Sequence, residues 1–69
     1  MIREYDVVRA KHDLSAEVQK GATGTVVMVY VPGQAYEVEF TGEDIYTSEL
    51  LTVKTHDIEL VKAWQTKHG

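Results

Sequence analysis

The pattern of apolar and polar residues is most distinctive between positions 21 and 40, where it predicts a β-hairpin. Residues 25–31 are β-branched or aromatic apart from one methionine, a composition typical of strands. Pro32-Gly33 follows as a turn dipeptide, because proline fixes φ and glycine tolerates a positive φ. Residues 36–40 then alternate between apolar and acidic side chains, which indicates one buried and one exposed face.

The first strand of this hairpin has apolar side chains on both faces. A single small core covers only one face, so the other must be covered by something else. If the turn has three residues, the parity reverses and the odd-numbered valines between 27 and 31 lie outside. Whichever apolar residues lie outside, curvature of the sheet and a loop at 11–19 are a further way to cover them. If the turn has two residues, the outer face consists of Val26, Met28 and Tyr30 beside Glu37 and Glu39.

The remaining pattern predicts further strands at 4–10, 45–54 and 58–61. In the second of these, Leu51 and Val53 form the inward pair and Leu50 an outer contact. The segment 11–19 is interpreted as a long loop anchored by two apolar residues, although Leu14 and Val18 are four apart and would also suit one helical turn. At 55–57 the Thr55 hydroxyl is a candidate cap for a single helical turn.

These elements indicate an all-β fold, an SH3-like small five-stranded barrel with a one-turn helix before the last strand. We expect one domain at residues 1–61 and a C-terminal tail at 62–69, in which Trp64 is the one distinctive residue. An open antiparallel sheet packed on a helix at 13–20 is the alternative.

Composition narrows the functional classes. The chain has 69 residues, no cysteine and a formal net charge of −4, and no apolar run approaches the ~20 residues that span a bilayer. We therefore expect a cytoplasmic protein without membrane partners. Residues 21–53 contain five acidic residues and no lysine or arginine, which argues against nucleic-acid binding through the hairpin. A small domain without disulfides often gains stability by self-association.

Two sequence blocks carry a family resemblance. Gly21-x-x-Gly24-Thr25-Val26-Val27 and Tyr36-Glu37-Val38-Glu39-Phe40, with Asp6-Val7-Val8 before and Leu51-Thr52-Val53 after them, resemble a family of stand-alone bacterial domains of unknown function. The resemblance implies a small β-barrel with no established activity, in mobile or toxin-associated gene neighbourhoods. The chain departs from the family pattern at Ala22, where an acidic residue is common, and in the Trp64 tail. It is also loosely similar to KOW-type modules.

Candidate catalytic groups are few. The three histidines, His12, His56 and His68, show no metal-ligand spacing, and we expect no metal and no cofactor. His56-Asp57 can orient an imidazole for acid–base chemistry, and Glu37 and Glu39 share a strand face, but a turn cap and a solvated face explain them as well. No nucleophile elbow or phosphate-binding loop is present in the sequence, so we expect no enzyme.

The sequence therefore predicts a non-enzymatic protein-interaction module, a regulator or antitoxin-like partner that self-associates through the central hairpin, with a dimer favoured. One alternative is a KOW-like nucleic-acid-binding module that uses basic residues at one barrel end: Arg3, Arg9, Lys11, Lys20 and Lys54. The other is a small-ligand or enzymatic site near His56 and Asp57. The predicted interface residues are Val26, Met28, Tyr30, Glu37, Glu39 and Trp64.

Overall fold

The computed structural model describes residues 1–42 and 48–64, and within these ranges the chain is all-β. Its strands form one antiparallel sheet in the order β4-β3-β2-β1-β5. The elements are β1 (Val7–Ala10), β2 (Thr23–Val31), β3 (Ala35–Thr41), β4 (Ser48–Lys54), the 3₁₀ turn η1 (Thr55–Asp57) and β5 (Ile58–Lys62). The predicted all-β class with a single helical turn before the last strand is confirmed, while the comparison with SH3 domains stays a prediction.

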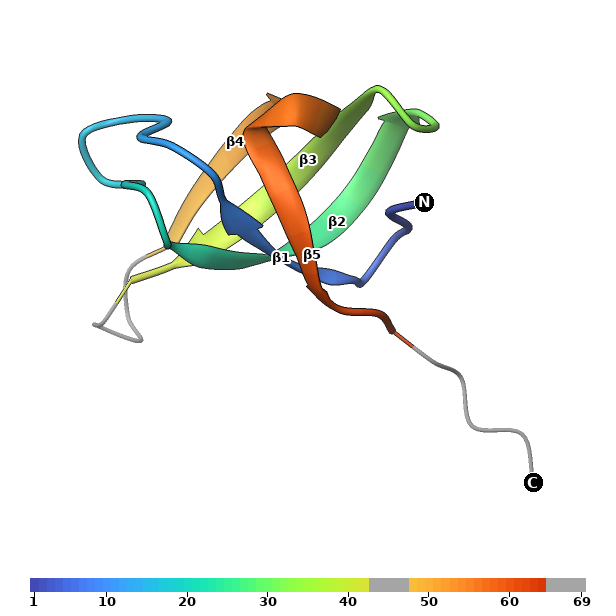
Figure 1. The fold of residues 1–69 in the computed structure, drawn as a ribbon, viewed down its shortest axis with the longest axis horizontal. Helices are drawn as coiled ribbons and strands as arrows, with labels where there is room; N and C mark the ends of the chain where they lie inside the picture. Colours follow the sequence, from blue (N-terminus) through green and yellow to red (C-terminus); the bar gives the residue numbers. More distant parts are fainter. Residues whose placement is uncertain (43–47, 65–69) are drawn as a thin grey trace.

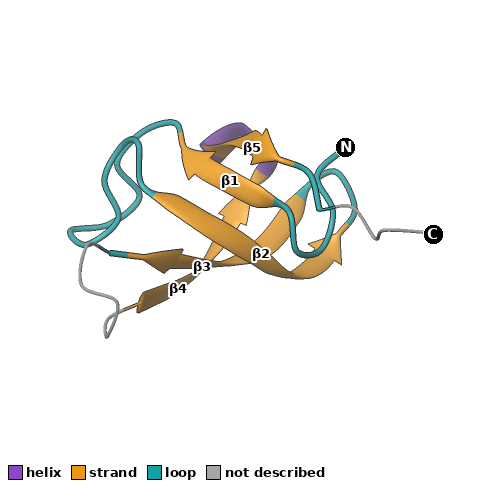
Figure 2. Cartoon of the chain, turned by 90° about the horizontal axis from the view of Figure 1, so that it is seen from below, coloured by secondary structure: helices purple, strands orange, loops and turns teal. Residues whose placement is uncertain are grey.

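The sheet is strongly curved. β2, β3 and β4 run alongside one another, and β5 crosses them in projection (Figure 1). Seen at right angles, β1 and β5 lie on one side and β3 and β4 on the other, with β2 passing between the two layers (Figure 2). The long β2 therefore belongs to both layers, as the right-handed twist and coil of a small sheet require.

Two irregularities in β2 explain its unusual sequence. Val26 lies opposite Val38, but Met28 lies opposite Glu37, so Val27 is an extra residue. A second register shift lies between Val29 and Val31. Each bulge changes which residues face inward. Consequently Val26 on one side of the first bulge and Val29 on the other both point toward the core, although their spacing is odd.

This arrangement corrects the prediction for Val26. Neither turn length alone describes the strand: the pairing of Val29 with Tyr36 fits a two-residue turn, whereas Val31 pairs with Ala35 across three residues. The bulge at Val27 then reverses the parity, so Val26 is fully buried and is not part of any surface. The alternative outer stripe of odd-numbered valines is wrong as well, because Val29 packs against the core.

The core lies inside the curve of the sheet. The predicted alternation of β3 is confirmed, and Val53 and Leu51 of β4 face inward while Leu50 is exposed. The segment 11–19 contains no helix, which excludes the helix-packed alternative, and it covers the core with Val18 and Leu14. The buried apolar residues are Val8, Ala10, Val18, Val26, Tyr36, Val38, Phe40, Val53 and Ile58.

Two local predictions are corrected, and two others fall outside the described residues. β1 begins at Val7 and not at residue 4, because Tyr5 adopts a positive φ of 73° in a turn. The Thr55 hydroxyl does not cap η1 but donates to the carbonyl of Gly33. The predicted strand start at 45–47 and His68 lie outside the described residues.

Candidate protein-interaction surface

The face of β2, β3 and β4 that points away from the core combines apolar and acidic side chains. In the strand register Glu37 lies between Met28 and Thr52, and Glu39 lies between Thr25 and Leu50. Tyr30, the extra residue of the second bulge, joins this face through its hydroxyl. We call this face the outer face and define it by Met28, Tyr30, Glu37, Glu39, Leu50 and Thr52.

The two glutamates of the outer face are fixed by hydroxyl groups from the neighbouring strands. Tyr30 Oη donates to Glu37 Oε1 at 3.1 Å, and Thr52 Oγ1 donates to the same oxygen at 2.7 Å. Ser48 Oγ donates to Glu39 Oε2 at 3.2 Å. Hydrogen bonds to an ionised acceptor are stronger than neutral ones, so this network favours defined positions for both carboxylates.

The hydrogen bond to Glu37 has a measurable consequence for Tyr30. This bond, followed by partial desolvation and the negative charge of Glu37, raises the pKa of the Tyr30 phenol above its ordinary value. We expect Glu37→Gln to lower the pKa of Tyr30 toward that ordinary value, because the neutral amide no longer disfavours the phenolate. An NMR titration of the Tyr30 ring carbon measures this. Glu39→Gln is the matched control and should leave Tyr30 unchanged; an equal effect of both variants would contradict the assignment.

Apolar side chains on the outer face remain half-exposed. The exposed fractions are 49% for Met28, 51% for Tyr30 and 58% for Leu50. Sequence alternation placed Leu50 outward but did not connect it with Glu39, since strand register is not readable from one strand. Thr52 and Ser48 carried no signal of their own in the sequence, and only the β3–β4 register reveals their role.

The predicted interface residue Trp64 has different neighbours. Its ring packs edge-on against Tyr5, with ring centroids 6.2 Å apart and planes at 69°. Its backbone N–H donates to Asp6 Oδ1 at 2.7 Å, so the contacts of Trp64 are with the start of the chain. The structure thus groups Met28, Tyr30, Glu37 and Glu39 on one face and places Trp64 at the Tyr5 turn.

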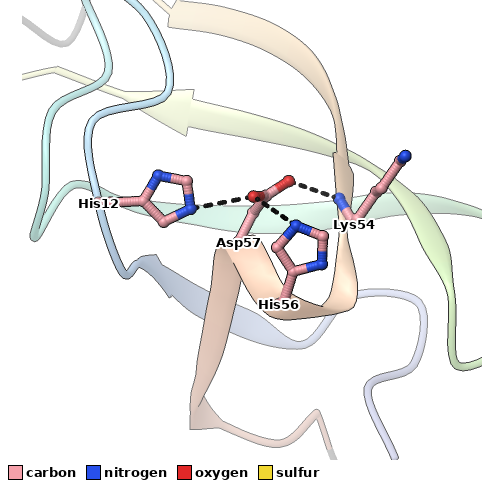
Figure 3. A network of polar contacts seen from close by, with 4 residues as sticks. All are labelled: His12, Lys54, His56 and Asp57. Atoms are coloured by element: carbon pink, nitrogen blue, oxygen red, sulfur yellow. Dashed lines mark hydrogen bonds and ion pairs between the residues drawn. The ribbon is translucent and has the colours of Figure 1, made fainter.

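A second polar cluster surrounds Asp57 in η1 (Figure 3). His12 Nε2 lies 3.0 Å and His56 Nε2 3.5 Å from Asp57 Oδ1, and the Lys54 backbone N–H donates to Oδ2 at 2.9 Å. The Asp57 backbone carbonyl also accepts from the N–H of Lys11. Both histidines are exposed, while the carboxylate is mostly buried. The cluster therefore fastens the start of the 11–19 loop to η1.

Asp57 is ionised more readily than an ordinary aspartate. Burial opposes ionisation and is the largest single effect, but the Lys54 N–H and the two imidazoles together outweigh it, so the pKa of Asp57 is lowered. A depressed folded-state pKa stabilises the fold above the ordinary carboxyl pKa, and this stabilisation is lost as pH falls through the folded value. The loss of stability at acid pH should therefore depend on Asp57.

We expect Asp57→Asn to lower the free energy of unfolding by about 1 kcal/mol at neutral pH, because charge-assisted hydrogen bonds are lost. The difference from the wild type should shrink as the pH falls below the carboxyl range. Urea unfolding across an acid-to-neutral pH series measures both effects. Glu4→Gln, at an exposed carboxylate, is the control. A constant difference between Asp57→Asn and the wild type at every pH would contradict this role.

Only some of the basic residues that were predicted to share one barrel end lie close together. Arg9, Lys11 and Lys20 line one shallow hollow beside Glu59, and Arg9 forms an ion pair with Glu59 at 2.8 Å. Lys54 lines a different hollow, together with His56 and the β2–β3 turn. The predicted basic barrel end is therefore divided, and one of its cations is already engaged by a carboxylate.

Within residues 1–42 and 48–64, no group of three or more potential ligand side chains is placed to hold a metal ion. No helix in these ranges has the length and apolar character needed to cross a membrane.

Comparison with known proteins assigns the chain to a family. No curated protein and no solved structure matches it. The sequence model of one family, described as a domain of unknown function (DUF4926), matches residues 4–60 and thus covers all of β1 to β4 and the start of β5. The chain therefore belongs to the DUF4926 family.

Proposed function

We propose that this chain is a non-enzymatic protein-interaction module whose outer face binds a partner protein. The observation that carries the proposal is the set of half-exposed apolar side chains, Met28, Tyr30 and Leu50, around two fixed glutamates. Aromatic and methionine side chains are enriched in protein interfaces, where they fill pockets on the partner. A regulator or an antitoxin-like protein would use such a surface.

The charge of the outer face favours a basic partner over a second copy. Glu37 and Glu39 lie in the middle of three strands, and residues 21–53 contain no lysine or arginine. Two copies placed face to face would bring these carboxylates together, and juxtaposed like charges cost binding energy. A partner with an arginine or lysine next to an apolar pocket would satisfy both features of the surface.

The positions of the acidic groups also favour binding over catalysis. Glu37 and Glu39 accept hydrogen bonds on the outer face, while Asp57 holds η1 to the 11–19 loop. The hollow beside His56 is lined by Lys54, Thr55 and the β2–β3 turn and not by either glutamate. The two glutamates and the cluster of Asp57 with its histidines thus serve separate local contacts.

Comparative affinity capture tests the proposal. Wild type, Met28→Asp and Leu50→Asp serve as baits in extract of the source cell. Tyr5→Asp is the control, because Tyr5 is similarly exposed but lies in neither the outer face nor β5. We expect a protein that wild type and the Tyr5 variant retain and both outer-face variants lose. Its direct affinity for the purified chain should decrease as ionic strength rises. A partner retained equally by all four baits would overturn the proposal.

A nucleic-acid-binding role is the second candidate, and it is favoured by the hollow that Arg9, Lys11 and Lys20 share. The ion pair between Arg9 and Glu59 weakens this candidate, because it leaves fewer cations for phosphates. Titration of the chain into single- and double-stranded RNA at low ionic strength separates the two roles. We expect no saturable binding; steeply salt-dependent binding lost in Lys11→Ala would establish this role instead.

A further inference from the structure

β5 is an edge strand that exposes apolar side chains. It pairs with β1 on one side and ends the strand order of the sheet. All of its residues after Ile58 are exposed, and the exposed fractions of Leu60 and Val61 are 46% and 47%. Alternate N–H and C=O groups of an edge strand have no partner in their own sheet, so such a strand can pair with another one.

The bulge in β5 places its two charged residues on the same face. Arg9 lies opposite Glu59, and Val7 lies opposite Lys62, while Val8 lies opposite Leu60. Val61 is therefore an extra residue. Arg9 and Val7 are two apart on β1 and share a face, and residues directly opposite one another in an antiparallel pair also share a face. Glu59 and Lys62 consequently point the same way, although a regular strand would separate them.

This arrangement is complementary to itself under a two-fold rotation. In an antiparallel pair of two β5 strands whose axis passes between Leu60 and Val61, Glu59 of each copy lies opposite Lys62 of the other. Leu60 lies opposite Val61 in the same register. Opposite charges on directly facing residues stabilise an antiparallel pair, and apolar residues between them are removed from water. Ala10 exchanges its backbone hydrogen bonds with the segment that leads into β2, so Arg9 and Val7 direct their backbone groups at Glu59 and Lys62. Glu59 and Lys62 therefore form the non-hydrogen-bonded pairs of the new contact, and Leu60 between them directs its backbone groups at the free edge.

We propose that β5 is a homodimerisation edge, at which a second copy of this chain pairs antiparallel to form a continuous sheet across the two domains. This site is distinct from the outer face and leaves it free for the proposed partner. A domain of this size gains stability from such pairing. The charge pattern selects the second copy, since Glu59-Leu60-Val61-Lys62 provides both charges of each ion pair.

Charge reversal at the two positions tests the pairing. The dimer contains two facing pairs of positions 59 and 62. Glu59→Lys turns both of them into lysine–lysine pairs, and Lys62→Glu turns both into glutamate–glutamate pairs. We expect a concentration-dependent dimer for the wild type by sedimentation velocity, and weakening by at least about tenfold in each variant alone. An equimolar mixture of the two variants should restore the dimer as a heterodimer, because every facing pair is then again of opposite charge.

Two controls keep the result interpretable. Circular dichroism and thermal unfolding verify that each variant is folded, which matters most for Glu59→Lys because Arg9 is adjacent. Met28→Asp on the outer face should leave the dimer unchanged. A wild type that stays monomeric at the highest soluble concentration, a mixture that fails to reassociate, or a dimer lost in Met28→Asp would each overturn the proposal. None of these outcomes depends on whether the outer face binds its partner.

Discussion

Replacing Gly24 by alanine is expected to unfold the domain or to remove most of its stability. Gly24 is buried in β2 opposite Phe40. A Cβ atom there would lie 2.7 Å from the Glu39 carbonyl oxygen, 2.8 Å from Val38 Cγ1 and 2.9 Å from Phe40 Cδ1. One of these atoms belongs to the backbone of the adjacent strand and the others to packed core side chains, so none can move away at low cost.

The expected loss for Gly24→Ala is about 3 kcal/mol or more, which approaches the roughly 3–5 kcal/mol that one small core supplies. Gly21 and Gly33 are the matched controls. Both have positive φ, 93° and 76°, but an added Cβ would meet nothing within 4 Å. Their alanine variants should cost only about 1 kcal/mol for the backbone conformation. Urea unfolding of the three variants measures the difference; a Gly24 variant as stable as the Gly33 variant would contradict the close approach.

Removal of the Asp6 carboxylate is expected to cause the second-largest loss of stability. Asp6 is 2% exposed and is the only charged residue in the buried set of the described chain. Its Oδ2 accepts from the Arg3 N–H at 2.9 Å and its Oδ1 accepts from the Trp64 N–H at 2.7 Å. One side chain thus joins the segment before β1 to the segment after β5. The adjacent positive φ at Tyr5 is held by the same turn, in which the Asp6 N–H donates to the Arg3 carbonyl.

Asp6→Ala should lower the free energy of unfolding by about 3 kcal/mol, because two charge-assisted hydrogen bonds are lost and their donors stay unsatisfied. The free energy of unfolding of Asp6→Asn should lie between those of the wild type and Asp6→Ala, since an amide keeps one acceptor oxygen. Trp64 is the single tryptophan of the chain, so its fluorescence reports directly on the release of this segment. Asp13→Ala, at an exposed carboxylate that accepts from the Lys20 N–H, is the control. Equal stability of the two alanine variants would refute this role.

Much of the fold was predictable because the hairpin signals are local. The alternation of residues 36–40 and the Pro32-Gly33 turn lie within single elements, and the structure confirms both. The anchors Val18 and Leu14 were also readable as apolar residues in an otherwise polar loop. The type of each element follows from propensity and periodicity over a few residues.

The bulges were not predictable, and they decide which face of β2 is exposed. A bulge depends on the partner strand as much as on its own sequence, so residues 25–31 read as a regular strand with two apolar faces. Val26 was assigned to the surface for this reason. Other contacts also join positions that are distant in sequence. They are the hydroxyl contacts of Thr52 and Ser48 with the glutamates, the hydrogen bond from Trp64 to Asp6, and the pairing of His12 with Asp57.

The division of β2 between the core and the outer face is the feature on which the proposed surface depends, and inter-strand NOEs test it most directly. We expect the backbone protons of Val26 to contact those of Val38, and those of Gly24 to contact those of Phe40. A regular hairpin with a two-residue turn would instead pair Val27 with Val38 and Thr25 with Phe40. Observation of that second set would contradict the bulge at Val27 and return Val26 to the outer face.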